Sequence, residues 1–344
     1  MAGGRALPAG PDAEARFVGR YLAPLAAGLP GAFGLLDDAA ALSPSPGDDV
    51  VATLDTLVEG VHFLFDASTS DARRIALKAL AVNVSDLAAK GARPYAYLLS
   101  LSLPDGFEHW FEGFAAGLGE GQRRWSLSLA GGDTTRSPGG FVVSITALGL
   151  VPAGRMVTRS GARAGDIVYV SGTIGEAALG LDLRLESPRA ALVAAQSAPQ
   201  AVTQWLARHA TPEPRLALAP LVLDHATAAM DVSDGLVLDL DRLARASGCG
   251  ASLEAARVPV SPPARRLVAS GVVELSDLLT GGDDYEILAT VAPENAALFE
   301  ASAEASGVAV TAIGTMRAGA GVDWLGTDGT PLAFARRGYQ HVDG

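Results

Sequence analysis

Aspartate residues recur in this sequence beside apolar, β-branched runs of the kind that form strands. They are Asp55 in VVATLDTL, Asp133 in SLSLAGGDTT, Asp231 and Asp234 in ATAAMDVSDG, and Asp283 and Asp284 in DLLTGGDDYE. We expect each of these carboxylates at the end of a strand. Ligands in α/β proteins collect outside strand ends, so acids from several strands predict one shared metal site.

Two further acids could join this site. Asp38 precedes the first of these runs, and Asp86 lies on a predicted helix whose same face carries Asn83 and Lys90. So many carboxylates repel one another unless cations lie between them. Oxygen ligands without a cysteine cluster favour Mg, Mn or Ca over Zn. For each acid alone, a turn or a helix cap is an alternative, because aspartate often hydrogen-bonds nearby backbone.

Glycines beside the acids could let backbone N–H groups approach phosphate oxygens, although tight turns explain them equally. They are Gly131 with Gly132, Gly172 with Gly175, and Gly281 with Gly282. The sequence has no G-x-x-x-x-G-K-S/T motif and no protein-kinase motif set, which excludes a P-loop site. Arg159 is the best candidate cation for a nucleotide, with an ordinary surface arginine as the alternative. His62 follows a turn, where a lone histidine is more often structural.

The bulk composition bounds the class of protein. At 344 residues with 49% hydrophobic content we expect two globular domains, 1–153 and 154–344, divided near MVTRSGARAGD. The net charge of -12 argues against nucleic-acid binding. The single cysteine, Cys249, excludes an internal disulfide. The N-terminus has no apolar leader and no run is long enough to span a bilayer, so we expect a cytoplasmic protein without membrane contact.

Periodicity predicts the strands and helices that position these residues. In the N-terminal part we expect helices at 12–29, 71–92 and 110–118, strands at 50–54, 97–104, 126–130 and 141–151, and a loop at 131–140. Ser70 is the expected N-cap of the second helix. In the C-terminal part we expect a strand, a turn and a helix over 166–183, helical structure over 187–214, helices at 236–248 and 295–306, and a strand at 308–314.

A series of motifs resembles the thiamine-monophosphate kinase family over nearly the whole chain. The motifs are LDTLVEGVHF, KALAVNVSDLAAKGA, LAGGDTTR, TRSGARAGD, DVSDGL, TGGDDYE and RRGYQH. The resemblance implies an α/β fold with mixed sheets, in two domains of the aminoimidazole ribonucleotide synthetase-like, or PurM-like, type. It makes the N-terminal domain the ATP- and Mg-binding, dimerising one. Related selenophosphate and hydrogenase-maturation enzymes carry a terminal reactive cysteine or selenocysteine, whereas Cys249 is internal.

The resemblance also implies roles for individual residues. Its magnesium ligands are Asp38, Thr53, Leu54 through its backbone, Asp55, Asp86, Asp133, Asp231 and Asp234. Its ATP contacts are Gly132, Asp133, Arg159 and Ser233, and its thiamine monophosphate contacts are His62, Asp283 and Tyr339. The chain departs from the family pattern at Leu36, where Gly is usual, at Leu54 in a motif that is usually Ser-Thr-Asp, and at Asp283, where Glu is commoner.

The implied activity is an ATP-dependent phosphorylation of thiamine monophosphate to the diphosphate, with Mg and without a covalent catalytic nucleophile. The acceptor is already a phosphate, so positioning and charge neutralisation supply most of the rate. The resemblance further implies a homodimer. Two alternatives stay open at this point: another ATP-using enzyme of the same superfamily, and a non-enzymatic nucleotide- or metal-binding protein.

Overall fold

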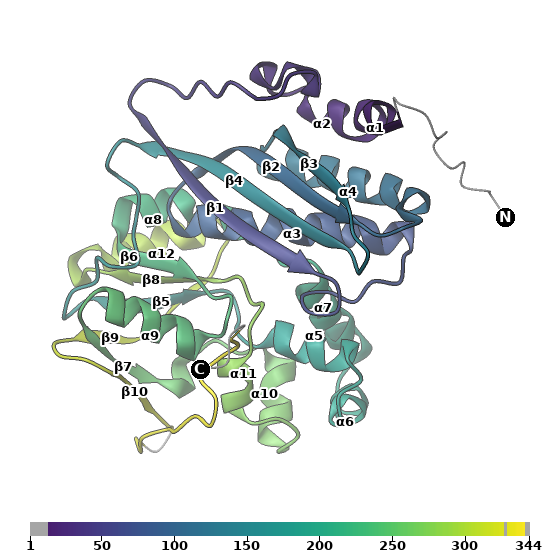
Figure 1. The fold of residues 1–344 in the computed structure, drawn as a ribbon. Coiled ribbons are helices and arrows are strands. Elements are labelled where there is room, and N and C mark those ends of the chain that lie inside the picture. The colour runs from purple at the N-terminus through teal and green to yellow at the C-terminus, as the bar shows by residue number, and fades with distance from the viewer. Residues whose placement is uncertain (1–12, 327–328, 341–344) are drawn as a thin grey trace. The chain divides into compact units, whose positions relative to one another are not determined.

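The computed structural model of the chain describes residues 13–326 and 329–340 (Figure 1). The expected helix start at Asp12 and the expected lack of an N-terminal leader fall outside the described residues. Two compact units are present, which we call unit 1 (Met1–Leu87 and Arg93–Gly154) and unit 2 (Ala88–Ala92 and Arg155–Gly344). Within the described ranges, no helix combines the length and apolarity needed to cross a membrane.

Unit 1 is built on a four-stranded sheet with the strand order β1-β4-β2-β3. The strands are β1 (Asp48–Val58), β2 (Arg93–Leu103), β3 (Leu129–Arg136) and β4 (Val142–Pro152). β4 pairs antiparallel with β1 and β2, whereas β2 pairs parallel with β3. The helical segments are α1 (Ala13–Phe17), η1 (Val18–Leu22), α2 (Ala23–Ala26), η2 (Pro30–Leu35), α3 (Thr69–Ala89), η3 (Phe107–His109) and α4 (Phe111–Trp125).

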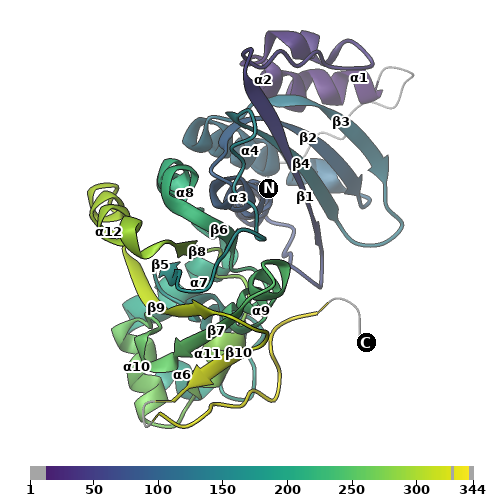
Figure 2. The same cartoon turned by 90° about the vertical axis from the view of Figure 1, so that its left-hand side faces the viewer.

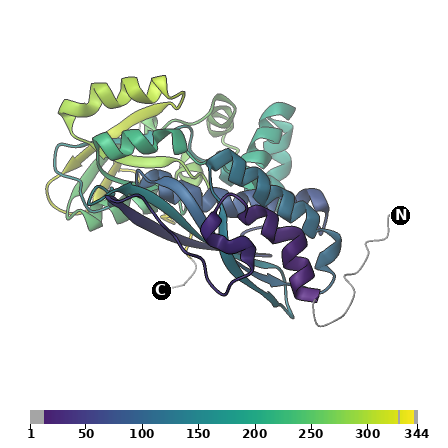
Figure 3. The same cartoon turned by 90° about the horizontal axis from the view of Figure 1, so that it is seen from above.

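Helices α3 and α4 cover one face of this sheet (Figures 1 and 3). Alternate residues of β4, Val143, Ile145 and Ala147, are fully buried, as expected for a strand with one covered face. The two helices approach closely at glycines of α4. A Cβ on Gly113 would lie 2.0 Å from the carbonyl oxygen of Thr69, so a side chain at this position would force the helices apart.

Unit 2 contains a six-stranded sheet with the order β10-β7-β9-β5-β8-β6. The strands are β5 (Ile167–Ser171), β6 (Ala226–Asp231), β7 (Gly250–Glu254), β8 (Ile287–Val291), β9 (Val310–Arg317) and β10 (Val322–Leu325). The helices are α5 (Glu176–Arg184), α6 (Ala190–Ala195), α7 (Pro199–Ala210), α8 (Ala219–His225), α9 (Leu236–Ala246), α10 (Pro262–Ala269), α11 (Leu275–Thr280) and α12 (Ala296–Ala305), with short turns η4 (Leu216–Leu218), η5 (Ala255–Arg257) and η6 (Pro293–Asn295).

The sheet of unit 2 is covered on both faces (Figure 2). On one face, Leu240 and Leu243 of α9 belong to the same buried cluster as Val170 of β5. On the other face, α12 contributes Phe299, whose ring lies 5.2 Å from that of Tyr169. The predicted α/β class with mixed sheets is confirmed, and both sheets contain parallel as well as antiparallel pairs.

Several predicted boundaries in unit 1 were wrong. Asp55 lies inside β1, which continues to Val58 because β4 pairs with it along that whole length. Residues 131–136 form part of β3 instead of a loop, so Asp133 also lies inside a strand, paired with Ser100. The helix expected to begin after Ser70 is instead capped by Ser68, whose hydroxyl accepts the N–H of Asp71 at 3.1 Å.

Boundaries in unit 2 also differ from the prediction. Asp231 is the last residue of β6, as expected, but Asp283 and Asp284 precede β8 instead of following a strand. Strands β7 and β10 and helix α8 were not predicted. β7 and β10 are short and paired with each other in parallel, so tertiary pairing stabilises them more than local alternation does.

Candidate functional site

In unit 1, strand β1 and helix α3 bring oxygen-bearing side chains together. The hydroxyl of Thr53 donates a hydrogen bond to the carboxylate of Asp86 on α3. Asp55 lies two residues after Thr53 on β1, so strand alternation directs it to the same face of the sheet. A hydroxyl and two carboxylates provide the ligand type that Mg²⁺ prefers. This part of the predicted metal set is therefore assembled on one face.

Asp133 belongs to a different row of the same sheet, where a row is a line of residues paired across neighbouring strands. It pairs with Ser100, which pairs with Ser144, and the hydroxyl of Ser144 is 2.6 Å from that of Thr56. Thr56 follows Asp55 directly, and adjacent rows of a sheet point to opposite faces. The register thus separates Asp133 from Asp55. Its neighbour Gly132 approaches the next strand closely, since a Cβ there would lie 1.9 Å from the carbonyl oxygen of Leu99.

The first predicted ligand, Asp38, lies on the exposed segment between η2 and β1. Leu36, where the resemblance implies glycine, has φ of -99° and a side chain that is 93% exposed. The backbone at this position requires no glycine, so leucine fits without strain. Leu54 also points its side chain outward and is 61% exposed, which is compatible with a role through its backbone alone.

His62 lies in a turn that closes on itself after β1. The ring Nδ1 of His62 accepts the backbone N–H of Val58 at 3.1 Å, and the backbone N–H of His62 donates to the Val58 carbonyl at 2.9 Å. The ammonium group of Lys78, a buried residue of α3, donates to the carbonyl oxygen of His62 at 3.2 Å. Because Nδ1 acts as an acceptor, the neutral ring carries its proton on Nε2.

In unit 2, segments that are far apart in the sequence meet at the end of β6. Backbone hydrogen bonds join the loops containing DVSDG and TGGDDYE and the segment containing GYQ. They are Asp283 N–H to Ser233 C=O at 2.8 Å, Tyr285 N–H to Val232 C=O at 2.8 Å, and Tyr339 N–H to Asp234 C=O at 2.9 Å. The structure therefore brings together the candidate residues Asp231, Ser233, Asp234, Asp283 and Tyr339 at the level of the backbone.

The DVSDG loop is fixed by Asp239, a fully buried residue of α9 that was not predicted. Its carboxylate accepts the N–H groups of Ser233 and Asp234 at 3.1 and 2.9 Å. Arg242 pairs with both Asp239 and Asp234. Burial raises the pKa of Asp239 to about 6, against the opposing effect of the hydrogen bond from Asp234. An acid within the apolar run LVLDLDRL was the available signal for this anchor.

Asp283 is held in an unusual backbone conformation. Its φ is 66°, a left-handed value that Asp tolerates, and that of Tyr285 is 50°, which costs a tyrosine about 1–2 kcal/mol. The carboxylate of Asp283 lies 3.3 Å from Nδ1 of His209 on α7 and accepts the Tyr285 hydroxyl at 3.4 Å. Such strain persists only where the surroundings over-determine it, often at functional sites.

The residues that alternate with Asp283 and Tyr285 are buried acids that anchor this segment. Asp284 accepts the N–H of Gly175 at 3.0 and 2.9 Å, and burial raises its pKa well above the ordinary value. Glu286 accepts Arg208, Arg215 and the Ser171 hydroxyl. Burial alone would raise the pKa of Glu286, but the hydrogen bond and charge of Arg215 lower it. Asp284 was predicted as a strand-end acid of the metal site and not as an anchor, and Glu286 was not predicted.

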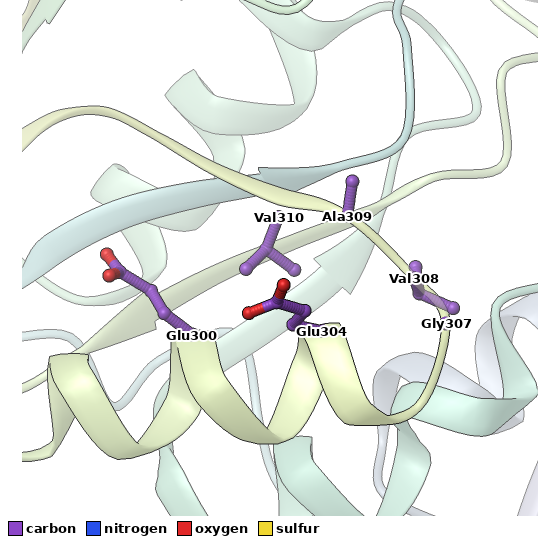
Figure 4. A pocket seen from close by; sticks show the side chains of 6 residues that line it. All are labelled: Glu300, Glu304, Gly307, Val308, Ala309 and Val310. Atoms are coloured by element: carbon purple, nitrogen blue, oxygen red, sulfur yellow. The ribbon is translucent and has the colours of Figure 1, made fainter.

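Arg159, the candidate nucleotide cation, has an exposed side chain, and its carbonyl oxygen accepts the Ser247 hydroxyl at 3.1 Å. Among the described residues no group of three or more His, Cys, Asp or Glu side chains could hold a metal ion by itself. A pocket of about 470 Å³ lies elsewhere in unit 2, at the end of α12 (Figure 4). Glu300 and Glu304 line it, and it includes no predicted site residue.

Comparisons with known proteins agree with this architecture. Residues 36–151 match the AIR synthase related protein, N-terminal domain, and residues 163–324 match the C-terminal domain of that family. The thiamine-monophosphate kinase of Caulobacter vibrioides is 41% identical over 97% of this chain and 92% of its own length.

Two solved structures of thiamine-monophosphate kinases are also similar to this chain. The thiamine-monophosphate kinase of Stenotrophomonas maltophilia is 38% identical, covers 87% of this chain and 91% of its own, and superposes with a TM-score of 0.76. AaThiL complexed with AMPPCP and TMP is 30% identical, covers 91% of this chain and 97% of its own, and gives a TM-score of 0.73. With these identities over most of its length, the chain belongs to the thiamine-monophosphate kinase family.

Proposed function

We propose that this chain transfers the γ-phosphoryl group of ATP to thiamine monophosphate and forms the diphosphate. The observation that carries the proposal is the 41% identity to the Caulobacter vibrioides kinase over 97% of the chain. The AaThiL complex contains AMPPCP, which is an analogue of ATP, together with TMP, and supports the same pair of substrates.

Magnesium is the proposed cofactor. In unit 1 its ligands would be Asp38, Thr53, the Leu54 backbone, Asp55, Asp86 and Asp133, and in unit 2 Asp231 and Asp234. The Thr53, Asp55 and Asp86 group fits a hard cation because it presents only oxygen atoms on one face. Two of these residues fit less directly: Arg242 already pairs with the carboxylate of Asp234, and the strand register directs Asp133 to the face opposite Asp55. When bound, magnesium would neutralise and bridge the phosphates.

Other residues of the chain would bind and orient the two substrates. ATP would contact Gly132, Asp133, Arg159 and Ser233, and thiamine monophosphate would contact His62, Asp283 and Tyr339. Gly132 exposes backbone because it carries no side chain, and Asp239 fixes the N–H of Ser233. The Asp283 carboxylate complements the positive charge of thiamine, and the half-exposed ring of Tyr339 can stack on it.

The transfer is proposed to occur in one in-line step without a phosphoenzyme. His62 is the side chain best suited to carry a covalent phosphate, but its Nδ1 is occupied by the N–H of Val58. The acceptor phosphate needs no strong base. ATP made chiral at its γ-phosphorus tests this step, because one displacement inverts the configuration. Net retention would contradict it and direct attention to Nε2 of His62.

A homodimer formed through unit 1 is the proposed assembly. The face of the sheet opposite α3 and α4 exposes Val50, Leu54 and Leu98 at 45, 61 and 41%. Leu54 of β1 and Leu98 of β2 pair with the same residue of β4, Thr146, so they share one surface that extends across these three strands from the edge strand β1. A second copy would cover this surface. Light scattering of a Leu98→Glu variant should then show a monomer, and an unchanged dimer would exclude this surface.

ADP release measured with and without thiamine monophosphate tests the activity directly. We expect turnover that requires thiamine monophosphate, disappears with excess chelator and returns with Mg. Equal ADP release in the absence of thiamine monophosphate would contradict the kinase assignment, and full activity in excess chelator would contradict the metal assignment.

A further inference from the structure

Helix α7 contacts the segment 281–286 through two consecutive residues. Arg208 donates to Glu286 at 2.5 Å, and Nδ1 of His209 lies 3.3 Å from the Asp283 carboxylate. Glu286 is buried directly before β8, whereas Asp283 lies three residues earlier in the preceding loop. The C-terminal end of α7 therefore contacts both Glu286, which anchors this segment, and Asp283, the candidate substrate contact.

The backbone of this segment is already fixed by other contacts. The N–H of Asp283 is bound by Ser233, that of Tyr285 by Val232, and the side chain of Asp284 is held by Gly175. What the backbone leaves undetermined is the direction of the Asp283 side chain. The Tyr285 hydroxyl donates to this carboxylate from within the same segment, and His209 reaches it from α7.

His209 itself occupies a rigid position. A Cβ on Gly180 of α5 would lie 2.9 Å from Cβ of His209 and 2.1 Å from the carbonyl oxygen of Trp205, so α5 and α7 are in close contact. Trp205 is fully buried, and the His209 side chain is only 11% exposed. Within the described part of the chain, Nδ1 makes no hydrogen bond of regular geometry. A small rotation of the His209 or Asp283 side chain would turn their 3.3 Å contact into a hydrogen bond.

We propose that His209 is a positioning residue for thiamine monophosphate, which holds the Asp283 carboxylate in the orientation that receives the substrate. The inference rests on the proposed contact between Asp283 and thiamine monophosphate. His209 acts through Asp283 and touches neither ATP nor the transferred phosphoryl group. Its loss should therefore change the KM for thiamine monophosphate without changing the KM for ATP.

The test compares His209→Leu, His209→Asn, Asp283→Ala and the double variant Asp283→Ala with His209→Leu. His209→Leu should raise the KM for thiamine monophosphate about tenfold, the scale of one lost polar contact with a charged group, with the KM for ATP within about twofold. Asparagine places an N–H near Nδ1 and should stay within about threefold of wild type. His225→Leu, a histidine of α8 in the same unit, is the matched control and should change neither constant.

The double variant separates positioning from simple packing. If His209 acts through Asp283, removing it in the Asp283→Ala background should add less than about twofold to the KM. Fully additive effects of the two substitutions on the KM would overturn the inference. An unchanged KM in His209→Leu, together with a raised KM in Asp283→Ala, would also overturn it. In both cases the proposed contact between Asp283 and the substrate stands. An unchanged KM in Asp283→Ala would remove the contact and the inference together. His209→Ala replaces the leucine variant if that protein does not fold.

Discussion

Replacing Glu286 with glutamine should destabilise unit 2 strongly, although the two side chains have nearly the same shape. Glu286 is fully buried and accepts Arg215 at 2.7 and 2.5 Å, Arg208 at 2.5 Å and Ser171 at 2.6 Å. The amide removes the charge and turns one acceptor into a donor that faces an arginine. Removing one partner of a buried ion pair costs about 3–5 kcal/mol, because the remaining charge stays buried without compensation. Arg208 and Arg215 are only 14 and 21% exposed, so solvent can recover little of this loss.

The loss should depend on pH in a defined direction. The pKa of Glu286 is lowered in the folded protein from its ordinary value of 4.5. A lowered carboxyl pKa contributes stability above the unfolded pKa, and this contribution disappears as pH falls through the folded pKa. The difference between wild type and Glu286→Gln should therefore be full at pH 7 and shrink below about pH 4.5.

Urea denaturation followed by the fluorescence of Trp205, in a background without the other tryptophans, reports on α7 directly. Glu254→Gln is the matched control, because its pair with Arg257 is exposed and should contribute less than about 1 kcal/mol. A loss below about 1 kcal/mol for Glu286→Gln, or a difference that grows towards acidic pH, would refute the reasoning.

Three further outcomes are expected. Asp55→Asn and Asp86→Asn should each lower kcat by orders of magnitude with an unchanged melting temperature, and activity within a few-fold of wild type would remove that residue from the metal set. Asp283→Ala and Tyr339→Ala should raise the KM for thiamine monophosphate more than that for ATP; a selective loss of ATP affinity would contradict their assignment. Burial raises the pKa of Asp239 from 3.8 to about 6, so ionisation of this group opposes folding. The free energy of unfolding of the wild type should therefore fall as pH rises from about 4 to 6. Denaturation at several pH values should find this slope absent in Asp239→Asn.

The sequence predicted the elements with strong local patterns. Helix α3 and strand β4 follow from periodicity, and the order of the motifs alone indicates the family. The ends of β1 and β3 could not be predicted locally, because pairing with β4 and β2 extends them through polar residues such as Asp55 and Asp133.

The supporting role of the buried acids Asp239, Asp284 and Glu286 was missed for a different reason. Asp284 and Glu286 have partners that lie far away in the sequence, namely Gly175 before α5, Ser171 of β5, Arg208 of α7 and Arg215. Asp239 binds Ser233 and Asp234 close by in the sequence, but no pattern in the sequence marks that loop as its partner. A single sequence shows an acid in an apolar context but does not show which arginine or N–H group compensates it. The candidate ligands were easier to see because glycines and turns surround them.

The contact between Tyr339 and the DVSDG loop constrains the order in which unit 2 can be completed during synthesis. Gly338 lies so close to that loop that a Cβ would be 2.5 Å from the carbonyl oxygen of Asp234 and 2.7 Å from Cβ of Leu238. The ribosome releases Asp234 and α9 long before Gly338 and Tyr339. The DVSDG loop and α9 therefore leave the ribosome early, whereas strand β9 of the sheet and this wall of the candidate site are completed only when the last part of the chain emerges.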